Sequence, residues 1–251
     1  MNKLIVKTNN KNYPIYVGNH ILKDLRKILI NEKINFRKTL IMVDKKIKKK
    51  FIKQTLINLK NKENYVIKFK STEINKNIGE VEKIINFLLS KNFSRHDCVI
   101  SLGGGILGDL SGFVSSIYKR GIKFINIPTT LLSQVDASIG GKLGIDFNSY
   151  KNQIGIFKIP NLIIVDTKFL SSLSERELKS GYAEVIKHCL IKDATKFKEI
   201  IKINWKDNNW EETVRHSILI KSEVVENDLT EGGLRKILNF GHTIGHAIET
   251  T

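Results

Sequence analysis

Flexible and polar residues gather where a predicted strand meets a predicted helix in the middle of the chain. Gly103, Gly104 and Gly105 end an apolar run that begins at Cys98, and a helical pattern of apolar residues follows them. A strand that turns through glycines into a helix presents unpaired N–H groups and the positive end of the helix dipole to an anion. The pattern therefore predicts a cradle for the diphosphate of a dinucleotide, although an ordinary tight turn would also use glycines.

A second group of polar residues follows the next strand. Thr129 and Thr130 end the apolar run around Ile127, and Asp136 and Lys142 come within the next twelve residues. Hydroxyl groups, a carboxylate and an ammonium this close together are not required by packing. We therefore expect them to form a binding or catalytic site beside the glycine turn.

The C-terminal half supplies residue types that bind metal ions. His242 and His246 are four residues apart, and Glu184 and Lys187 are three apart, so each pair lies on one face of its predicted helix. A carboxylate with imidazoles suits Zn²⁺, and a catalytic zinc site keeps one position open for substrate. Histidines with ordinary packing or surface roles would give the same spacing. Three other histidines have no such setting, and we interpret them as structural: His96, His188 and His216.

Alternating strands and helices must position these residues. Buried strands are predicted at 39–43, 65–69, 98–102 and 162–165, with helices at 46–59 and 77–91 between them. Two short strands, 4–6 and 15–17, and a helix at 20–30 precede this series. The alternation predicts an α/β domain with a mainly parallel, Rossmann-like sheet, in which an acid at a strand end such as Asp44 can accept ribose hydroxyls.

The pattern changes after Asp166. Only helical periods follow, at 175–191, 194–203, 210–226 and 234–249. We therefore predict an NAD-binding α/β domain over 1–167 and an all-helical metal- and substrate-binding domain over 168–251. A cleft between two such domains is a natural place for a ligand.

The composition limits the classes of protein to consider. The 251 residues are 41% hydrophobic and carry a formal net charge of +17. Basic chains often bind nucleic acid, but here the lysines are spread along the chain, and we do not expect a nucleic-acid partner. We find no apolar run of 18 residues and no secretory signal core, so we expect no membrane partner and a cytoplasmic location. Cys98 and Cys189, inside apolar patterns, are predicted to be buried thiols.

Five stretches together resemble the 3-dehydroquinate synthases: GGGILGDLSGF, IPTTLLSQVDASIGGKLGI, KNQIGIF, GYAEVIKH and EGGLRKILNFGHTIGHAIE. They occur in the family's order and spacing and cover essentially the whole chain. The resemblance implies a dehydroquinate synthase-like fold and a carbon–oxygen lyase of the shikimate pathway. That enzyme converts 3-deoxy-D-arabino-heptulosonate 7-phosphate into 3-dehydroquinate and phosphate for aromatic amino acid biosynthesis. It uses catalytic NAD and a divalent metal, Zn²⁺ or Co²⁺.

The resemblance also implies roles for individual residues. Cofactor contacts fall on Asp44, Glu73, Lys76, Gly103, Gly104, Gly105, Asp109, Thr129, Thr130, Lys142, Lys151 and Ser172, with the first three at the adenosine end. Catalytic and substrate-binding roles fall on Asp136, Lys142, Lys151, Asn152, Lys187, Lys221, Arg235, Asn239 and His246. Metal binding falls on Glu184 and His242. Arg120 matches an arginine that reaches the partner subunit's substrate phosphate, which implies a homodimer.

The resemblance leaves alternatives open. The family has a third metal-ligand histidine downstream of GHTIGHAIE, whereas this sequence ends at Thr251, so we expect an incomplete helical domain. A truncated and inactive remnant of the enzyme is therefore one alternative. Another is a different sugar-phosphate cyclase or a metal-dependent polyol dehydrogenase. The KNQIGIF and EGGLRKILNFGHT stretches favour the synthase over these relatives.

Overall fold

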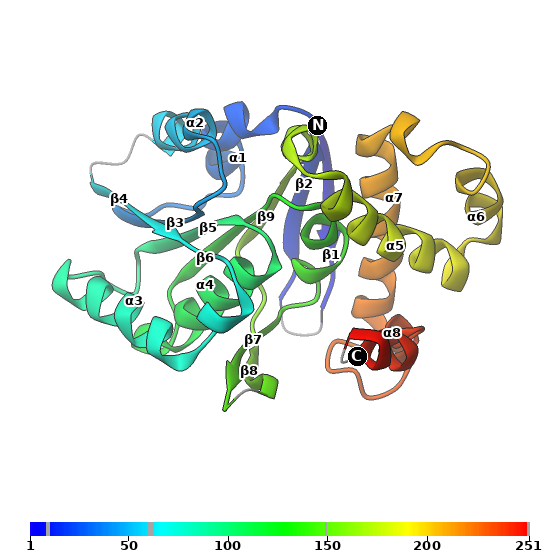
Figure 1. Ribbon diagram of the computed structural model, residues 1–251. Coiled ribbons are helices and arrows are strands. Elements are labelled where there is room, and N and C mark those ends of the chain that lie inside the picture. The colour runs from blue at the N-terminus through cyan, green and yellow to red at the C-terminus, as the bar shows by residue number, and fades with distance from the viewer. Residues whose placement is uncertain (9–10, 60–62, 149, 250–251) are drawn as a thin grey trace.

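A seven-stranded sheet forms the centre of the molecule (Figure 1). The computed structural model describes residues 1–8, 11–59, 63–148 and 150–249. The strand order is β1-β2-β9-β6-β5-β3-β4, and only the edge strand β1 runs antiparallel to its neighbour. The prediction of a mainly parallel, Rossmann-like sheet is confirmed. The strands are β1 (Asn2–Val6), β2 (Tyr13–Gly18), β3 (Lys38–Asp44), β4 (Glu63–Phe69), β5 (Cys98–Gly103), β6 (Lys123–Pro128) and β9 (Leu162–Asp166).

Helices cover both faces of this sheet because its central strands are buried along their length, and successive side chains point to opposite faces. In β3, Ile41 packs into one buried cluster with α1 (Leu25–Asn31) and α2 (Lys49–Leu59). The next residue, Met42, packs into another cluster on the opposite face, with α3 (Ile78–Ser90) and α4 (Gly105–Ile117). These four helices follow the predicted periodicity.

The C-terminal half contains four further α-helices among its described residues. They are α5 (Glu175–Lys192), α6 (Ala194–Ile200), α7 (Trp210–Asn227) and α8 (His242–Glu249). The first three agree with the predicted helices, but the predicted single helix over 234–249 is wrong. The chain instead forms a 3₁₀ segment, Leu234–Asn239, and then the separate helix α8. Gly241, which lies between them, has a φ of +84°. A residue in this left-handed conformation interrupts a helix.

A two-stranded hairpin was not predicted. Strands β7 (Lys142–Phe147) and β8 (Tyr150–Phe157) pair antiparallel and project from the sheet domain (Figure 1). Leu143 and Ile145 of β7 are buried in the cluster around α4. The hairpin therefore places Lys142 at its base and Asn152 on its outer strand, close to the predicted site.

The apolar core continues from the sheet into the C-terminal helices. Ile15 and Val17 of β2 share one buried cluster with Val185 of α5 and with Val214 and Ile218 of α7. The predicted boundary near 167 is therefore crossed by packed side chains. The division into two domains stays a prediction.

Candidate active site

The first part of the candidate site lies at the carboxyl ends of β3 and β5. The chain runs from β3 outward to β4 and then returns to β5, so the direction of winding reverses between β3 and β5. Ligands of doubly wound sheets bind at such a reversal. A cavity of about 380 Å³ opens here. Seven predicted cofactor residues line it: Asp44, Glu73, Gly104, Gly105, Thr129, Thr130 and Ser172.

The glycine turn lies so close to the neighbouring turn that side chains at Gly104 and Gly105 would be crowded. A Cβ atom on Gly105 would lie 3.2 Å from Cβ of Ala137, and one on Gly104 would lie 3.3 Å from Cγ2 of Thr130. Gly103 ends β5 and Gly105 begins α4, so the N-terminus of a 13-residue helix faces this cavity. Backbone N–H groups at such a terminus fit a diphosphate.

A second cavity, of about 550 Å³, is lined by half of the predicted substrate residues. It lies between the base of the hairpin and the C-terminal helices. Its lining includes Asp109, Asp136, Lys142, Asn152, Lys221, Arg235 and His242. The sequence placed these residues in five separate stretches, and the fold brings them around one space.

Lys76 joins the second cavity to the sheet. Its buried ammonium lies 2.7 Å from Asp109 Oδ2 and donates to Asn152 Oδ1 at 2.6 Å. Burial raises the pKa of Asp109 to about 6, and Lys76 offsets only part of that effect. Lys76 therefore contacts residues of the second cavity, while its predicted role at the adenosine end stays a prediction.

An ion pair lies deep in the second cavity. Lys221 Nζ is 2.5 Å from Asp136 Oδ1 and donates to the Asp136 carbonyl oxygen at 2.6 Å. Burial alone would raise the pKa of Asp136, but Lys221 outweighs it and holds that pKa at about 2. Burial also lowers the pKa of Lys221, against the effect of Asp136. This corner of the cavity therefore keeps its carboxylate ionised.

Glu231 is a site residue that the sequence reasoning missed. Its carboxylate forms an ion pair with Lys142 and accepts from Asn239 Nδ2 at 2.8 Å. Arg235, also buried, donates to the Gly140 carbonyl oxygen at 3.2 Å. The sequence feature that could have identified Glu231 is its position in the EGGLR stretch, four residues before the predicted substrate residue Arg235. An anionic ligand that reaches Lys142 and Asn239 must share them with Glu231 or displace it.

The predicted metal ligands come together at the edge of this cavity. Lys187 Nζ lies 2.5 Å from Glu184 Oε2 and 3.5 Å from His242 Nε2, so a cation already stands between the two predicted ligands. Carboxylate oxygens of Asp136 and Glu184 and a ring nitrogen of His188 lie within 4.8 Å of one another. Burial lowers the pKa of His188 to about 3, so its imidazole is neutral. Oxygen and neutral imidazole donors fit a divalent ion such as Zn²⁺ or Co²⁺.

Two further predicted site residues are exposed and do not line either cavity. Arg120 is exposed just before β6, at the amino end of the parallel strands and away from the glycine turn. Lys151 is exposed on β8. His246 lies in α8, and its side chain is outside the described part of the chain. The roles of all three stay predictions.

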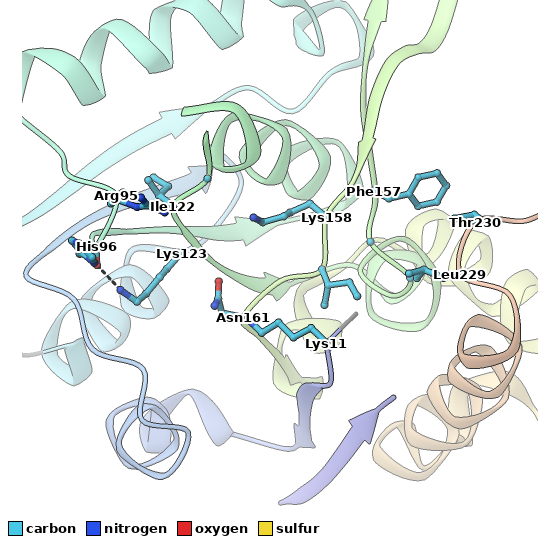
Figure 2. Close-up of a pocket in the computed structure, with 14 residues that line it drawn as sticks. Lys11, Arg95, His96, Ile122, Lys123, Phe157, Lys158, Asn161, Leu229 and Thr230 are labelled. Carbon is cyan, nitrogen blue, oxygen red and sulfur yellow. Dashed lines mark hydrogen bonds between the residues drawn. The ribbon is translucent and has the colours of Figure 1, made fainter. Parts of the chain in front are cut away.

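A third cavity, of about 600 Å³, lies on the other side of the segment around Gly140. Figure 2 shows the basic side chains of Lys11, Arg95, Lys123 and Lys158 around it. Lys123 Nζ donates to the His96 carbonyl oxygen at 2.7 Å. The described lining residues include none of those predicted for cofactor, substrate or metal. This cavity is therefore separate from the candidate site.

Comparison with known families agrees with this geometry. The profile described as "3-dehydroquinate synthase N-terminal" matches residues 66–180, and that described as "3-dehydroquinate synthase C-terminal" matches residues 181–251. The chain belongs to the 3-dehydroquinate synthase family. The 3-dehydroquinate synthase of Pelagibacter ubique is 48% identical over 256 residues, which cover 99% of this chain and 69% of that protein. That of Dictyoglomus turgidum is 44% identical over 254 residues, covering 99% and 70%.

Solved structures of sugar-phosphate cyclases share the fold of this family member. A 2-deoxy-scyllo-inosose synthase complexed with carbaglucose-6-phosphate, NAD⁺ and Co²⁺ has a TM-score of 0.89 at 25% identity, covering 99% of this chain and 70% of that one. The 2-epi-5-epi-valiolone synthase of Streptomyces hygroscopicus with NAD⁺ and Zn²⁺ bound has a TM-score of 0.81 at 26% identity, covering 94% and 68%. Among the described residues, no helix combines the length and apolar character needed to span a membrane.

Proposed function

We propose that the chain is a phosphate-eliminating carbon–oxygen lyase that converts 3-deoxy-D-arabino-heptulosonate 7-phosphate into 3-dehydroquinate. The observation that carries this proposal is the pair of adjoining cavities. One is lined by seven residues predicted for NAD, and the other by seven predicted for substrate, cofactor or metal. The family membership and the 48% identity to a 3-dehydroquinate synthase support the same activity.

The second cavity has the charge that such a substrate requires. The substrate carries a carboxylate and a phosphate, so several cations must converge on it. Lys221 and Arg235 are buried at the cavity, and Lys142 lies at its entrance with nearly half of its side chain exposed. We assign them to the two anionic groups of the substrate. Asn152 and Asn239 would orient its hydroxyl groups.

The first cavity suits NAD. Asp44 lies at the end of β3, where a carboxylate can accept the hydroxyls of the adenosine ribose. The N-terminus of α4 would hold the diphosphate, and Thr129 and Thr130 would contact the part of the cofactor nearest to the second cavity. Bound NAD would supply hydride-transfer chemistry, and Glu184 and His242 would hold a divalent ion that would supply polarisation of a substrate oxygen.

The ammonium of Lys187 is the group placed to act at the reacting carbon. It is buried between Glu184 and His242, at the edge of the substrate cavity. There it would stabilise negative charge on oxygen and hold a proton at Nζ. The ion pair of Lys221 with Asp136, in which Lys221 is buried, would fix the opposite side of the substrate. The protein therefore acts mainly by positioning charged groups.

The remaining features of the proposal follow from the family. We propose Zn²⁺ or Co²⁺ as the metal, a homodimer in which Arg120 reaches the partner's substrate, and a cytoplasmic location in the shikimate pathway. An inactive remnant is not favoured, because four of the predicted catalytic side chains line one cavity: Asp136, Lys142, Lys221 and Arg235.

One assay tests the proposed function. Purified chain is incubated with the heptulosonate phosphate, and released phosphate is measured with and without added NAD and Zn²⁺. We expect release that requires NAD and is abolished by chelation of the metal. Glucose 6-phosphate serves as the comparison substrate and should release no phosphate. Release from glucose 6-phosphate alone would instead identify another sugar-phosphate cyclase, and no release from either substrate would refute the proposal.

A further inference from the structure

The surroundings of His188 give this ring a specific orientation. His188 follows Glu184 by one turn of α5, and its side chain is fully buried. Ring atom Nδ1 lies 2.5 Å from Ser217 Oγ on α7. The other ring nitrogen, Nε2, is buried with no hydrogen-bond partner among the described residues. A buried polar atom left in this way costs free energy unless a ligand satisfies it.

Two carboxylate oxygens lie near the His188 ring. One from Glu184 and one from Asp136 lie with a His188 ring nitrogen within 4.8 Å of one another. Glu184 Oε2 forms its ion pair with Lys187 but has no hydrogen bond of acceptable geometry. Glu184 and His188 share a helix face because they are four residues apart. One nitrogen and two oxygens converging in this way form a donor set for a divalent transition metal.

We propose that His188, through Nε2, is a further ligand of the divalent cation that binds at Glu184. This inference rests on the proposed function only in that a cation binds there. For Nε2 to keep its lone pair, Nδ1 must carry the ring proton and donate it to Ser217 Oγ. Ser217 is then the positioning residue that fixes the tautomer and the direction of the ring.

The spacing of the three donors shows how far they must move. The three atoms are at most 4.8 Å apart, so an ion placed between them would lie at most about 2.8 Å from each. Zinc binds nitrogen and oxygen at roughly 2.0–2.2 Å, so each donor must move inward by several tenths of an ångström at most. Side-chain rotation supplies movement of this size, and Lys187 must leave Glu184 for the ion to enter.

The direct test is NMR of the full chain labelled with ¹⁵N in its histidine rings, titrated with Zn²⁺. We expect the Nε2 resonance of His188 to move to that of a metal-bound nitrogen, with Nδ1 still protonated. Calorimetry on the same sample reports whether Zn²⁺ binds at all. Binding of Zn²⁺ with an unchanged His188 resonance would overturn this inference alone. No binding would overturn both the inference and the metal role in the proposed function.

Variants add a second readout. His188→Gln should weaken Co²⁺ binding by about tenfold or more and reduce the visible absorption of bound Co²⁺. The matched control is His216→Gln, because His216 pairs with Asp193 at 2.9 Å and lies outside the donor cluster. Equal Co²⁺ affinity and spectra for both variants would contradict the proposal. If His188→Gln does not fold, Ser217→Ala removes the hydroxyl beside Nδ1, and the ring resonances that it shifts are those of His188. The Zn²⁺ titration of the unmodified chain then shows whether Nε2 binds the metal.

Discussion

The ammonium of Lys187 lies 2.5 Å from a carboxylate oxygen of Glu184, in the space between that carboxylate and His242. A side-chain cation thus stands where a divalent ion would bind, and it must withdraw when the ion enters. The same side chain is the group we expect to stabilise negative oxygen during turnover. Lys187 therefore has opposite effects on metal binding and on catalysis.

Replacing this lysine should separate the two effects. Lys187→Met removes a positive charge a few ångströms from the ion, so we expect Zn²⁺ to bind several-fold to about tenfold more tightly, which corresponds to roughly 1 kcal/mol. Phosphate release should fall to background while NAD affinity stays unchanged. Calorimetry and the phosphate assay measure these quantities. Turnover at the unmodified rate would remove the catalytic role of Lys187.

Asp44 tests the separation of the two cavities. Asp44→Ala removes a carboxylate at the end of β3, and a hydrogen bond to a charged group is worth roughly 1.5–3 kcal/mol. We expect NAD affinity to fall by at least about tenfold, with little change in affinity for the substrate phosphate. Titration of NADH fluorescence measures the effect. Asp207→Ala, at an exposed carboxylate, is the control, and equal loss in both variants would argue against a ribose contact.

Gly181 sets how closely α5 approaches the segment that carries Asp136. A Cβ atom there would lie 2.4 Å from the backbone nitrogen of Leu132 and 2.6 Å from Cβ of Leu131. Gly181→Ala should therefore lower the free energy of unfolding by about 2–3 kcal/mol and weaken metal binding, because α5 must shift. The control is Gly245→Ala, where no described atom lies within 4 Å. Thermal unfolding of both variants measures this, and equal stabilities would contradict the packing argument.

Asp109 should make the free energy of unfolding depend on pH. Its pKa is about 6 in the folded chain because of burial, against an ordinary value of 3.8. The folded state holds this proton more tightly, so the stabilisation is complete below about pH 4 and is lost as pH rises through 6. Relative to Asp109→Asn, the unfolding free energy should therefore fall by about 2.4 kcal/mol between pH 4 and pH 7. Chemical unfolding across this range measures the difference, and a constant difference would refute the shifted pKa.

The sequence predicted the sheet well because its strands are apolar runs that end in chemically distinctive residues. Asp44 and Gly103 mark the carboxyl ends of β3 and β5, and the fold brings both to one edge. The hairpin was missed because its outer strand is largely exposed and has no strong apolar alternation. The break at Gly241 was missed because helical periodicity continues across it.

The candidate site was predicted as a set of residues but not as a set of contacts. Pairings such as Lys76 with Asp109 and Lys142 with Glu231 join residues far apart in sequence, so periodicity holds no sign of them. His188 is the sharpest example. The sequence indicated only a structural role for this histidine, and only the packing of α5 on α7 shows the direction of its Nε2 atom.

The cluster that joins Ile15 and Val17 of β2 to Val185, Val214 and Ile218 has a mechanical consequence. Swinging the C-terminal helices as a rigid lobe would pull these fully desolvated side chains apart, at a cost of the order of a kilocalorie per mole for each. Admission of ligand is therefore expected to rely on smaller parts: the projecting hairpin and the glycine-rich bend that carries Glu231. The C-terminal helices would keep their position relative to the sheet, and the hairpin and the bend at Glu231 would close over the ligand.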